Sequence, residues 1–150
     1  MRRIVGSIIV AALAVFGFAS VAESESTGVS RTELARGQAG SDYAIKGASG
    51  TDVVAVKVTF EPGATAPWHT RTGPETAIVV SGTLTLFSAD DPKCAPHEYK
   101  AGEVLLGTSK VPHQVKNLGK EPVQLVITYF DVPAGGHVHA PAERPSNCPE

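Results

Sequence analysis

Three side chains that could bind a divalent metal ion lie in two short segments of the chain. His69 and Glu75 stand between Gly63 and Gly82, just ahead of an apolar stretch, and His113 stands in a second segment further along. Two imidazoles and one carboxylate are a ligand set that divalent transition metals favour, and such a set leaves coordination positions open for a substrate. This chemistry requires that the strands of one small barrel bring the two segments together.

Each candidate also has a purely structural interpretation. His69 and His113 can be hydrogen-bonded histidines of a protein core, because buried polar groups normally find partners within the fold. Trp68 either packs at the mouth of a barrel or stacks on a bound ligand, which makes it a candidate ligand-binding residue. Asn117 is interpreted as a residue that hydrogen-bonds local backbone where a strand ends. The residue types alone leave these alternatives open.

The spacing of these residues resembles that of the two sequence motifs of the cupin family, over roughly residues 50–132. The matching positions are Gly63, His69, Glu75 and Gly82 in the first motif, and Gly102, His113 and Asn117 in the second. The resemblance implies an all-β fold, a small double-stranded β-helix or jelly-roll barrel of the single-domain cupin type. It also implies that His69, Glu75 and His113 line the barrel and hold a metal ion such as Fe, Mn, Ni, Cu or Zn.

Three positions depart from the cupin motifs. Arg71 stands where the second histidine is expected, Thr108 where a proline is expected, and Lys110 where a glycine is expected. A guanidinium has no free lone pair and stays protonated, so Arg71 cannot replace a metal ligand, but its planar fork suits an anion. Two interpretations stay open. Either a three-ligand metal remains and Arg71 orients a carboxylate-bearing molecule, or Arg71 pairs with Glu75 and the barrel binds an organic anion or nothing.

Alternating apolar and polar residues separated by turn residues predict many short strands and therefore a sandwich or barrel. Ser81–Gly82 is interpreted as a two-residue hairpin turn between two of these strands. No segment has a helical period. The predicted strands span residues 52–60, 76–80, 83–88, 103–108, 111–116 and 122–132.

The two ends of the chain differ in composition from the middle. Residues 1–22 combine an early arginine pair, an apolar run and small residues before Ala22, which predicts a cleaved secretory signal peptide. Residues 23–50 are interpreted as a polar leader followed by short edge strands, and residues 51–132 as the barrel. Residues 133–150 form a tail rich in Pro and Gly, in which no strand is expected. We therefore expect a protein exported to the periplasm, the cell envelope or the medium.

The two cysteines of the chain are Cys94 and Cys148. An even count in an exported protein predicts a disulfide, which would tie the tail to the loop that follows Phe87. Two further histidines, His137 and His139, lie two residues apart in this tail. They are interpreted as solvent-exposed, with a small surface metal site or a position over the barrel mouth as alternatives.

The composition of the chain indicates which classes of partner the protein is not expected to bind. The chain has 13 basic and 15 acidic side chains, and loss of the two leader arginines makes it more acidic, so no basic surface for nucleic acid is expected. No membrane association is expected after signal cleavage, and no nucleophile motif is present. Three functions remain open: a protein that binds a small molecule, anionic or neutral, in its barrel with or without a divalent metal, a metal-dependent oxygenase or isomerase, or a metal-free structural or interaction module. A homodimer is plausible only by analogy with cupins.

Overall fold

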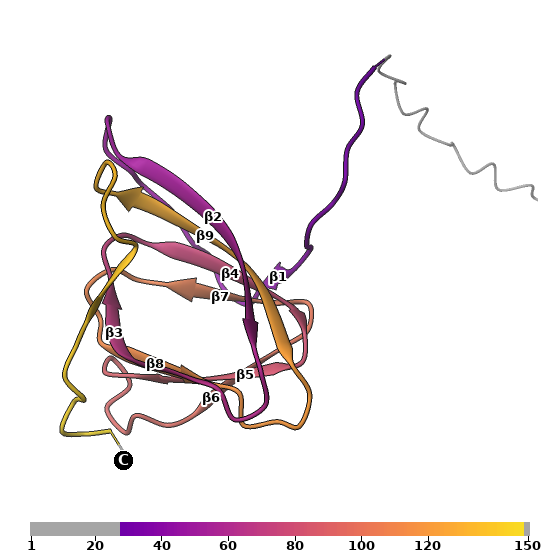
Figure 1. Cartoon of the computed structure of the whole chain (residues 1–150). Coiled ribbons are helices and arrows are strands. Elements are labelled where there is room, and N and C mark those ends of the chain that lie inside the picture. The colour runs from indigo at the N-terminus through magenta and orange to yellow at the C-terminus, as the bar shows by residue number, and fades with distance from the viewer. Residues whose placement is uncertain (1–27, 149–150) are drawn as a thin grey trace, which may run out of the picture. The chain divides into compact units, whose positions relative to one another are not determined.

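The structure is a computed structural model and describes residues 28–148, in which strands form two sheets and no helix occurs. Residues 28–31 carry no strand, and the barrel is formed by residues 32–148 (Figure 1). The strands are β1 (Gln38–Ala39), β2 (Asp52–Phe60), β3 (Thr65–Arg71), β4 (Glu75–Ser81), β5 (Thr83–Ser88), β6 (His97–Lys100), β7 (Glu103–Gly107), β8 (His113–Lys116), β9 (Val123–Val132) and β10 (His139–Pro141).

The two sheets face each other and enclose the core. One sheet has the order β1-β7-β4-β9-β2, and the other has the order β10-β3-β8-β5-β6. Strand β9 shows why the sequence folds this way, because its alternate residues Val123, Leu125, Ile127 and Tyr129 are all buried. The predicted all-β jelly-roll barrel is therefore confirmed, and its two sheets lie opposite each other (Figure 1).

The hairpin predicted at Ser81–Gly82 is wrong. Strands β4 and β5 follow one another in sequence but belong to different sheets, so Gly82 lies where the chain crosses from one sheet to the other. Gly82 has a φ of 79°, and a Cβ atom there would lie 2.9 Å from the carbonyl oxygen of Pro122. Only glycine tolerates this combination of backbone conformation and close approach.

The prediction that the tail contains no strand is also wrong. Strand β10 pairs antiparallel with β3, which places His139 opposite Arg71 and Pro141 opposite His69. Pro141 ends β10 at the edge of its sheet, where a missing backbone N–H is tolerated. The tail thus adds an edge strand to the barrel next to the candidate site residues.

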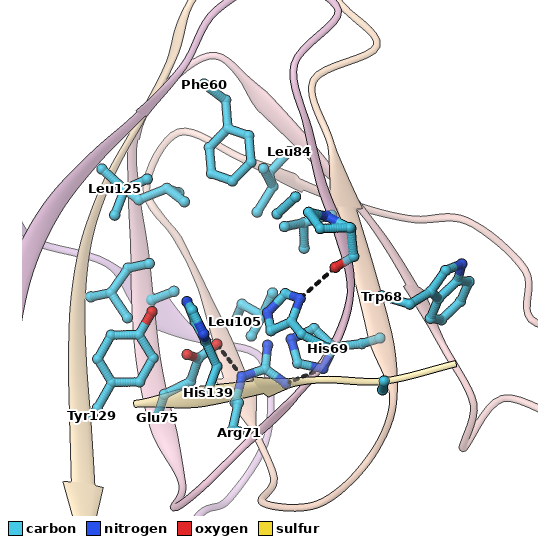
Figure 2. Close-up of a pocket in the computed structure, with 18 of the residues that line it drawn as sticks. Phe60, Trp68, His69, Arg71, Glu75, Leu84, Leu105, Leu125, Tyr129 and His139 are labelled. Atoms are coloured by element: carbon cyan, nitrogen blue, oxygen red, sulfur yellow. Dashed lines mark hydrogen bonds and ion pairs between the residues drawn. The ribbon is translucent and has the colours of Figure 1, made fainter. Parts of the chain in front are cut away.

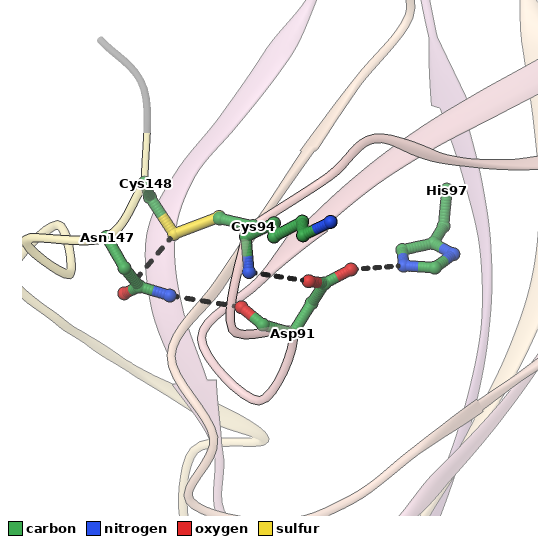
Figure 3. Close-up of polar contacts among 6 residues, drawn as sticks. Asp91, Cys94, His97, Asn147 and Cys148 are labelled. Carbon is green, nitrogen blue, oxygen red and sulfur yellow. Dashed lines mark hydrogen bonds and ion pairs between the residues drawn. A yellow bond between two sulfur atoms is a disulfide. The ribbon is translucent and has the colours of Figure 1, made fainter.

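The predicted disulfide between Cys94 and Cys148 is confirmed, and both cysteines are buried. It ties the end of the tail to the loop between β5 and β6 (Figure 3). Asn147 strengthens the same junction by donating a hydrogen bond of 3.0 Å from Nδ2 to the carbonyl oxygen of Asp91. The tail is therefore held at two places, at β3 by strand pairing and at this loop by the disulfide.

The predicted signal peptide, residues 1–22, lies outside the described residues and stays a prediction. Within residues 28–148, the structure has no helix of the length and apolar character needed to cross a membrane.

Candidate functional site

A cavity of about 810 Å³ lies inside the barrel. One part of it is apolar, and the other gathers the polar side chains that the sequence analysis singled out (Figure 2). A volume of this size is typical of pockets that bind small molecules. The apolar lining includes Val58, Phe60, Ala77, Leu84, Leu105, Val115, Leu125 and Ile127, and the polar lining includes His69, Arg71, Glu75, His113, Tyr129, His137 and His139.

Strand pairing explains how the polar residues meet. His69 and Arg71 are two residues apart on β3 and so share one face, which points into the cavity. His113 begins β8 and pairs directly with His69, so their ring centroids lie 4.1 Å apart. The pairing of β3 with β8 is irregular between Ala66 and His69. This places an irregularity around Pro67, a residue that has no N–H to offer the neighbouring strand.

Arg71 and Glu75 form a buried ion pair in the polar part of the cavity. Arg71 Nε lies 2.5 Å from Glu75 Oε1, and each side chain is 6% exposed. The N–H is not aligned with the oxygen, so the contact is electrostatic rather than a well-formed hydrogen bond. Burial raises the pKa of the Glu75 carboxyl above its usual range, and the Arg71 guanidinium offsets this only in part. This is the pairing foreseen in the second of the two interpretations of Arg71.

Both candidate histidines are oriented by a backbone carbonyl two residues earlier. His69 Nδ1 lies 2.7 Å from the carbonyl oxygen of Pro67, and His113 Nδ1 lies 2.9 Å from that of Val111. A neutral imidazole that donates from Nδ1 keeps its Nε2 as an acceptor or metal ligand. Arg71 Nη1 lies 3.2 Å from His113 Nδ1, but an Nδ1 that donates to Val111 cannot also accept from the guanidinium.

The residues do not fit a metal centre as they are arranged. Within the part of the chain that the structure describes, no three His, Cys, Asp or Glu side chains form a group that could hold one metal ion. The orientation of His69 and His113 suits ligation, but Glu75 is engaged by Arg71, whose guanidinium also contacts His113. A fixed cation among the ligands opposes a divalent ion electrostatically. The metal-ligand roles of His69, Glu75 and His113 stay predictions.

The other residues singled out in the sequence have separate roles. Trp68 lies at the edge of the cavity, and its indole points away from the histidines, so its ligand-binding role stays a prediction (Figure 2). Asn117 is fully buried and donates from Nδ2 to the carbonyl oxygens of Phe60 and Glu121, as expected for a structural residue. Lys110 has a φ of 64°, which explains why glycine suits this position.

Two features of the site were missed by sequence reasoning. Tyr129 faces Glu75 across the pairing of β4 with β9, and burial raises the pKa of its hydroxyl to about 12. Gly107 pairs with Glu75 across β4 and β7 and provides the space for the ion pair. A Cβ atom on Gly107 would lie 2.6 Å from Arg71 Nε and 2.6 Å from Glu75 Cγ. Nothing in the sequence marks Gly107 as a site residue except that it is a glycine within a predicted strand.

Gly107→Ala is expected to destabilise the protein by about 1–3 kcal/mol, because the added methyl group overpacks a buried and charged contact. Urea unfolding measures this loss. Gly40→Ala is the matched control, since a Cβ atom there meets no atom within 4 Å. Equal stability of the Gly107 and Gly40 variants would contradict the close packing described above.

His113 is expected to stay uncharged between pH 5 and pH 8. Burial, together with the nearby Arg71, lowers the pKa of the His113 imidazole to about 3. The unfolded chain binds a proton near the ordinary histidine pKa of about 6.5, whereas the folded chain does not. Acidification from about pH 6.5 toward pH 3 therefore favours unfolding. The contribution of neutral His113 to the free energy of unfolding is fully present above the unfolded pKa of about 6.5 and is lost as the pH falls toward 3.

Proton-detected NMR of the imidazole carbons measures this titration directly. In the His113→Gln variant, the free energy of unfolding is expected to fall less than in the parent protein as the pH is lowered from about 6.5. Buried Glu75 contributes with the opposite sign, because its raised pKa means that ionisation at higher pH disfavours the fold. An imidazole of His113 that titrates near pH 6.5 would contradict its burial beside Arg71.

Comparison with known proteins agrees with the fold. Residues 56–129 match the family model described as a cupin domain. A protein of Klebsiella pneumoniae with a double-stranded β-helix domain is similar, with a TM-score of 0.52 and 25% identity over 63% of this chain and 77% of that one. No curated protein matches the sequence.

Two further solved structures are similar to this chain. A conserved barrel domain protein of Salinispora arenicola has a TM-score of 0.48 and 23% identity, over 55% of this chain and 66% of that one. A DMSP lyase structure has a TM-score of 0.52 and 16% identity, over 61% of this chain and 44% of the lyase. At this identity the lyase shares the fold alone.

Proposed function

Because this chain belongs to the cupin family, we propose that it binds a small organic anion inside its barrel, with Arg71 as the residue that contacts the negative group. The observation that carries this proposal is a buried guanidinium at the polar part of a cavity that is otherwise lined by apolar side chains. A ligand with an apolar body and a carboxylate or sulfonate group matches both parts. We also propose that the protein is exported, which the leader pattern and the disulfide support.

Arg71 keeps a donor for such a ligand. Its Nε faces Glu75 and its Nη1 faces His113, and neither contact involves Nη2. Charge-assisted hydrogen bonds from a guanidinium to an anion are strong and geometrically specific. Burial lowers the pKa of both His69 and His113 and leaves their rings uncharged, so Arg71 rather than these histidines provides the charge that attracts an anion.

Anilinonaphthalene sulfonate and phenyl-naphthylamine test the proposal as a matched pair of probes, because they share an aromatic body and only the first carries an anionic group. Trp68 is the only tryptophan and lies at the edge of the cavity, so energy transfer from it reports a probe bound there. Arg71→Gln is expected to weaken sulfonate binding by about tenfold or more, as loss of a charged hydrogen bond of 1.5–3 kcal/mol implies. Binding of the neutral probe is expected to change little.

Arg36→Gln is the control for this experiment. Arg36 also pairs with a glutamate, Glu33, but this pair is exposed and neither residue lines the cavity. Equal sulfonate affinity in the parent protein, the Arg71 variant and the Arg36 variant would overturn the proposal.

A metal-dependent enzyme, an oxygenase or an isomerase, is the second candidate. The observation in its favour is that Nδ1 of both His69 and His113 contacts a carbonyl, which leaves each Nε2 free. Elemental analysis of the untagged exported protein beside His113→Ala tests it. Near-stoichiometric Fe, Mn, Ni, Cu or Zn that is lost in the variant would support this candidate over the first.

A further inference from the structure

The C-terminal strand β10 forms part of the cavity wall. Four tail residues line the cavity, namely His137, His139, Pro141 and Ala142. None of the positions that carry the family resemblance lies in this segment, which begins after the matched region ends at residue 129. The binding site is therefore incomplete without a segment that the motifs do not include.

Backbone hydrogen bonds fix this wall against β3. Thr72 N donates to the carbonyl oxygen of Val138 at 3.1 Å, and Ala142 N donates to that of Trp68 at 3.0 Å. Thr72 Oγ1 also donates to the carbonyl oxygen of His137 at 3.0 Å. These contacts hold both ends of β10 on the strand that carries His69 and Arg71.

His139 is the tail side chain best placed to contact a ligand bound at Arg71. The two residues are direct partners in the antiparallel pairing of β10 and β3, and such partners project from the same face of the sheet. The His139 ring lies edge-on to the His69 ring, with centroids 5.2 Å apart, and Figure 2 shows it on the same side of the cavity as Glu75 and Tyr129. Among residues 28–148, no side chain or backbone group is hydrogen-bonded to the His139 ring nitrogens.

We propose that His139 is a ligand-binding residue that contacts the bound anion together with Arg71, and that the Cys94–Cys148 disulfide holds the wall on which it stands. The inference rests on the proposed function and assigns the tail to the same site. The backbone that carries His139 is held on β3 before the ligand arrives, so binding has to order the side chain alone. The tail thereby supplies an imidazole to a site in which Arg71 stands at the position expected for the second histidine.

The two probes described above distinguish the two parts of this inference. His139→Ala is expected to weaken anilinonaphthalene sulfonate about tenfold, the change that corresponds to one hydrogen bond to a charged group, and to leave phenyl-naphthylamine unchanged. His97→Ala is the matched control, because His97 is also exposed but lies on β6, where it contacts Asp91 of the preceding loop, and it does not line the cavity.

Replacing both cysteines by serine, Cys94→Ser with Cys148→Ser, tests the tether. This variant is expected to release both probes several-fold faster, because loss of the tether loosens a wall that the two probes share. Circular dichroism checks that its barrel is intact, and His139→Ala in the disulfide-bonded protein keeps the test decisive if it is not. Unchanged release from a folded double variant would overturn the role of the tether.

The failure of this inference is distinguishable from the failure of the proposed function. If Arg71→Gln weakens the sulfonate probe and His139→Ala does not, His139 is no ligand-binding residue and the proposed function stands. If neither variant weakens it, the anion site itself is wrong.

Discussion

Arg71→His is expected to raise the affinity of the barrel for a divalent metal ion. The substitution removes the cation that contacts both Glu75 and His113. It also places an imidazole at the position where the cupin motif has its second histidine. His69 and His113 are already oriented through Nδ1, so three imidazoles and a freed carboxylate become available. Metal at about a hundredfold excess over its Kd would then stabilise the fold by about 2.7 kcal/mol.

Elemental analysis and thermal unfolding with added Zn²⁺ or Mn²⁺ measure this gain. Arg71→Gln removes the cation without adding a ligand and separates the two contributions of the substitution. Arg71→His combined with Glu75→Gln is expected to lose much of the gain, because the carboxylate is then absent. Stoichiometric metal in the parent protein would contradict the argument that Arg71 opposes it.

Glu75→Gln is expected to tighten the binding of an organic anion and to leave the stability of the empty protein about unchanged. Removing the carboxylate leaves the Arg71 guanidinium without its partner, but burial raises the pKa of Glu75, so its own charge also opposes folding and the two effects offset each other. The same change leaves the guanidinium free of its carboxylate, so an entering anion no longer competes with Glu75. Sulfonate affinity is expected to rise about tenfold, and the probe is expected to stabilise this variant more than the parent protein.

Chemical unfolding with and without anilinonaphthalene sulfonate measures both effects. Glu33→Gln is the control, since it breaks an exposed Arg–Glu pair and is expected to change neither stability nor affinity measurably. The combined replacement Arg71→Met with Glu75→Leu removes both buried charges and is expected to abolish the preference for the anionic probe. A Glu75→Gln variant that binds the sulfonate no more tightly than the parent would contradict the competition between Glu75 and the anion.

The raised pKa of Glu75 predicts that anion binding to the parent protein depends on pH. Burial already favours the protonated carboxyl, and a protonated Glu75 no longer holds Arg71 by charge. Anion binding in the parent protein is therefore expected to strengthen as the pH falls toward the Glu75 pKa. The Glu75→Gln variant is expected to lack this dependence.

The barrel could be predicted from the sequence because its strands carry a strong local signal. Alternating apolar residues mark β2 and β9, and the motif spacing placed His69, Glu75 and His113 in one cavity. The crossing at Gly82 could not be predicted, because a glycine after a strand looks the same in a hairpin and in a connection between sheets. Strand β3 was obscured by Pro67, which interrupts the apolar pattern at the place where the pairing with β8 is irregular.

The tail was misjudged for a different reason. A strand of three residues that contains a proline has almost no local signal, and β10 forms because the edge of β3 offers it hydrogen bonds. Arg71 was recognised as a departure from the motif, but residue types alone could not decide between a metal and an ion pair. Gly107 favours the ion pair, because its missing side chain provides the space that Arg71 and Glu75 occupy.

A crystal structure of the exported, untagged protein, grown with anilinonaphthalene sulfonate and excess Zn²⁺, tests the central claim most directly. The account predicts the sulfonate group within hydrogen-bond distance of Arg71, the aromatic body among the apolar side chains, and no Zn²⁺ among His69, Glu75 and His113. Zn²⁺ held by these three residues, with Arg71 turned away from Glu75, would contradict it and favour the metal-dependent enzyme. A probe bound only outside the barrel would contradict the anion site itself.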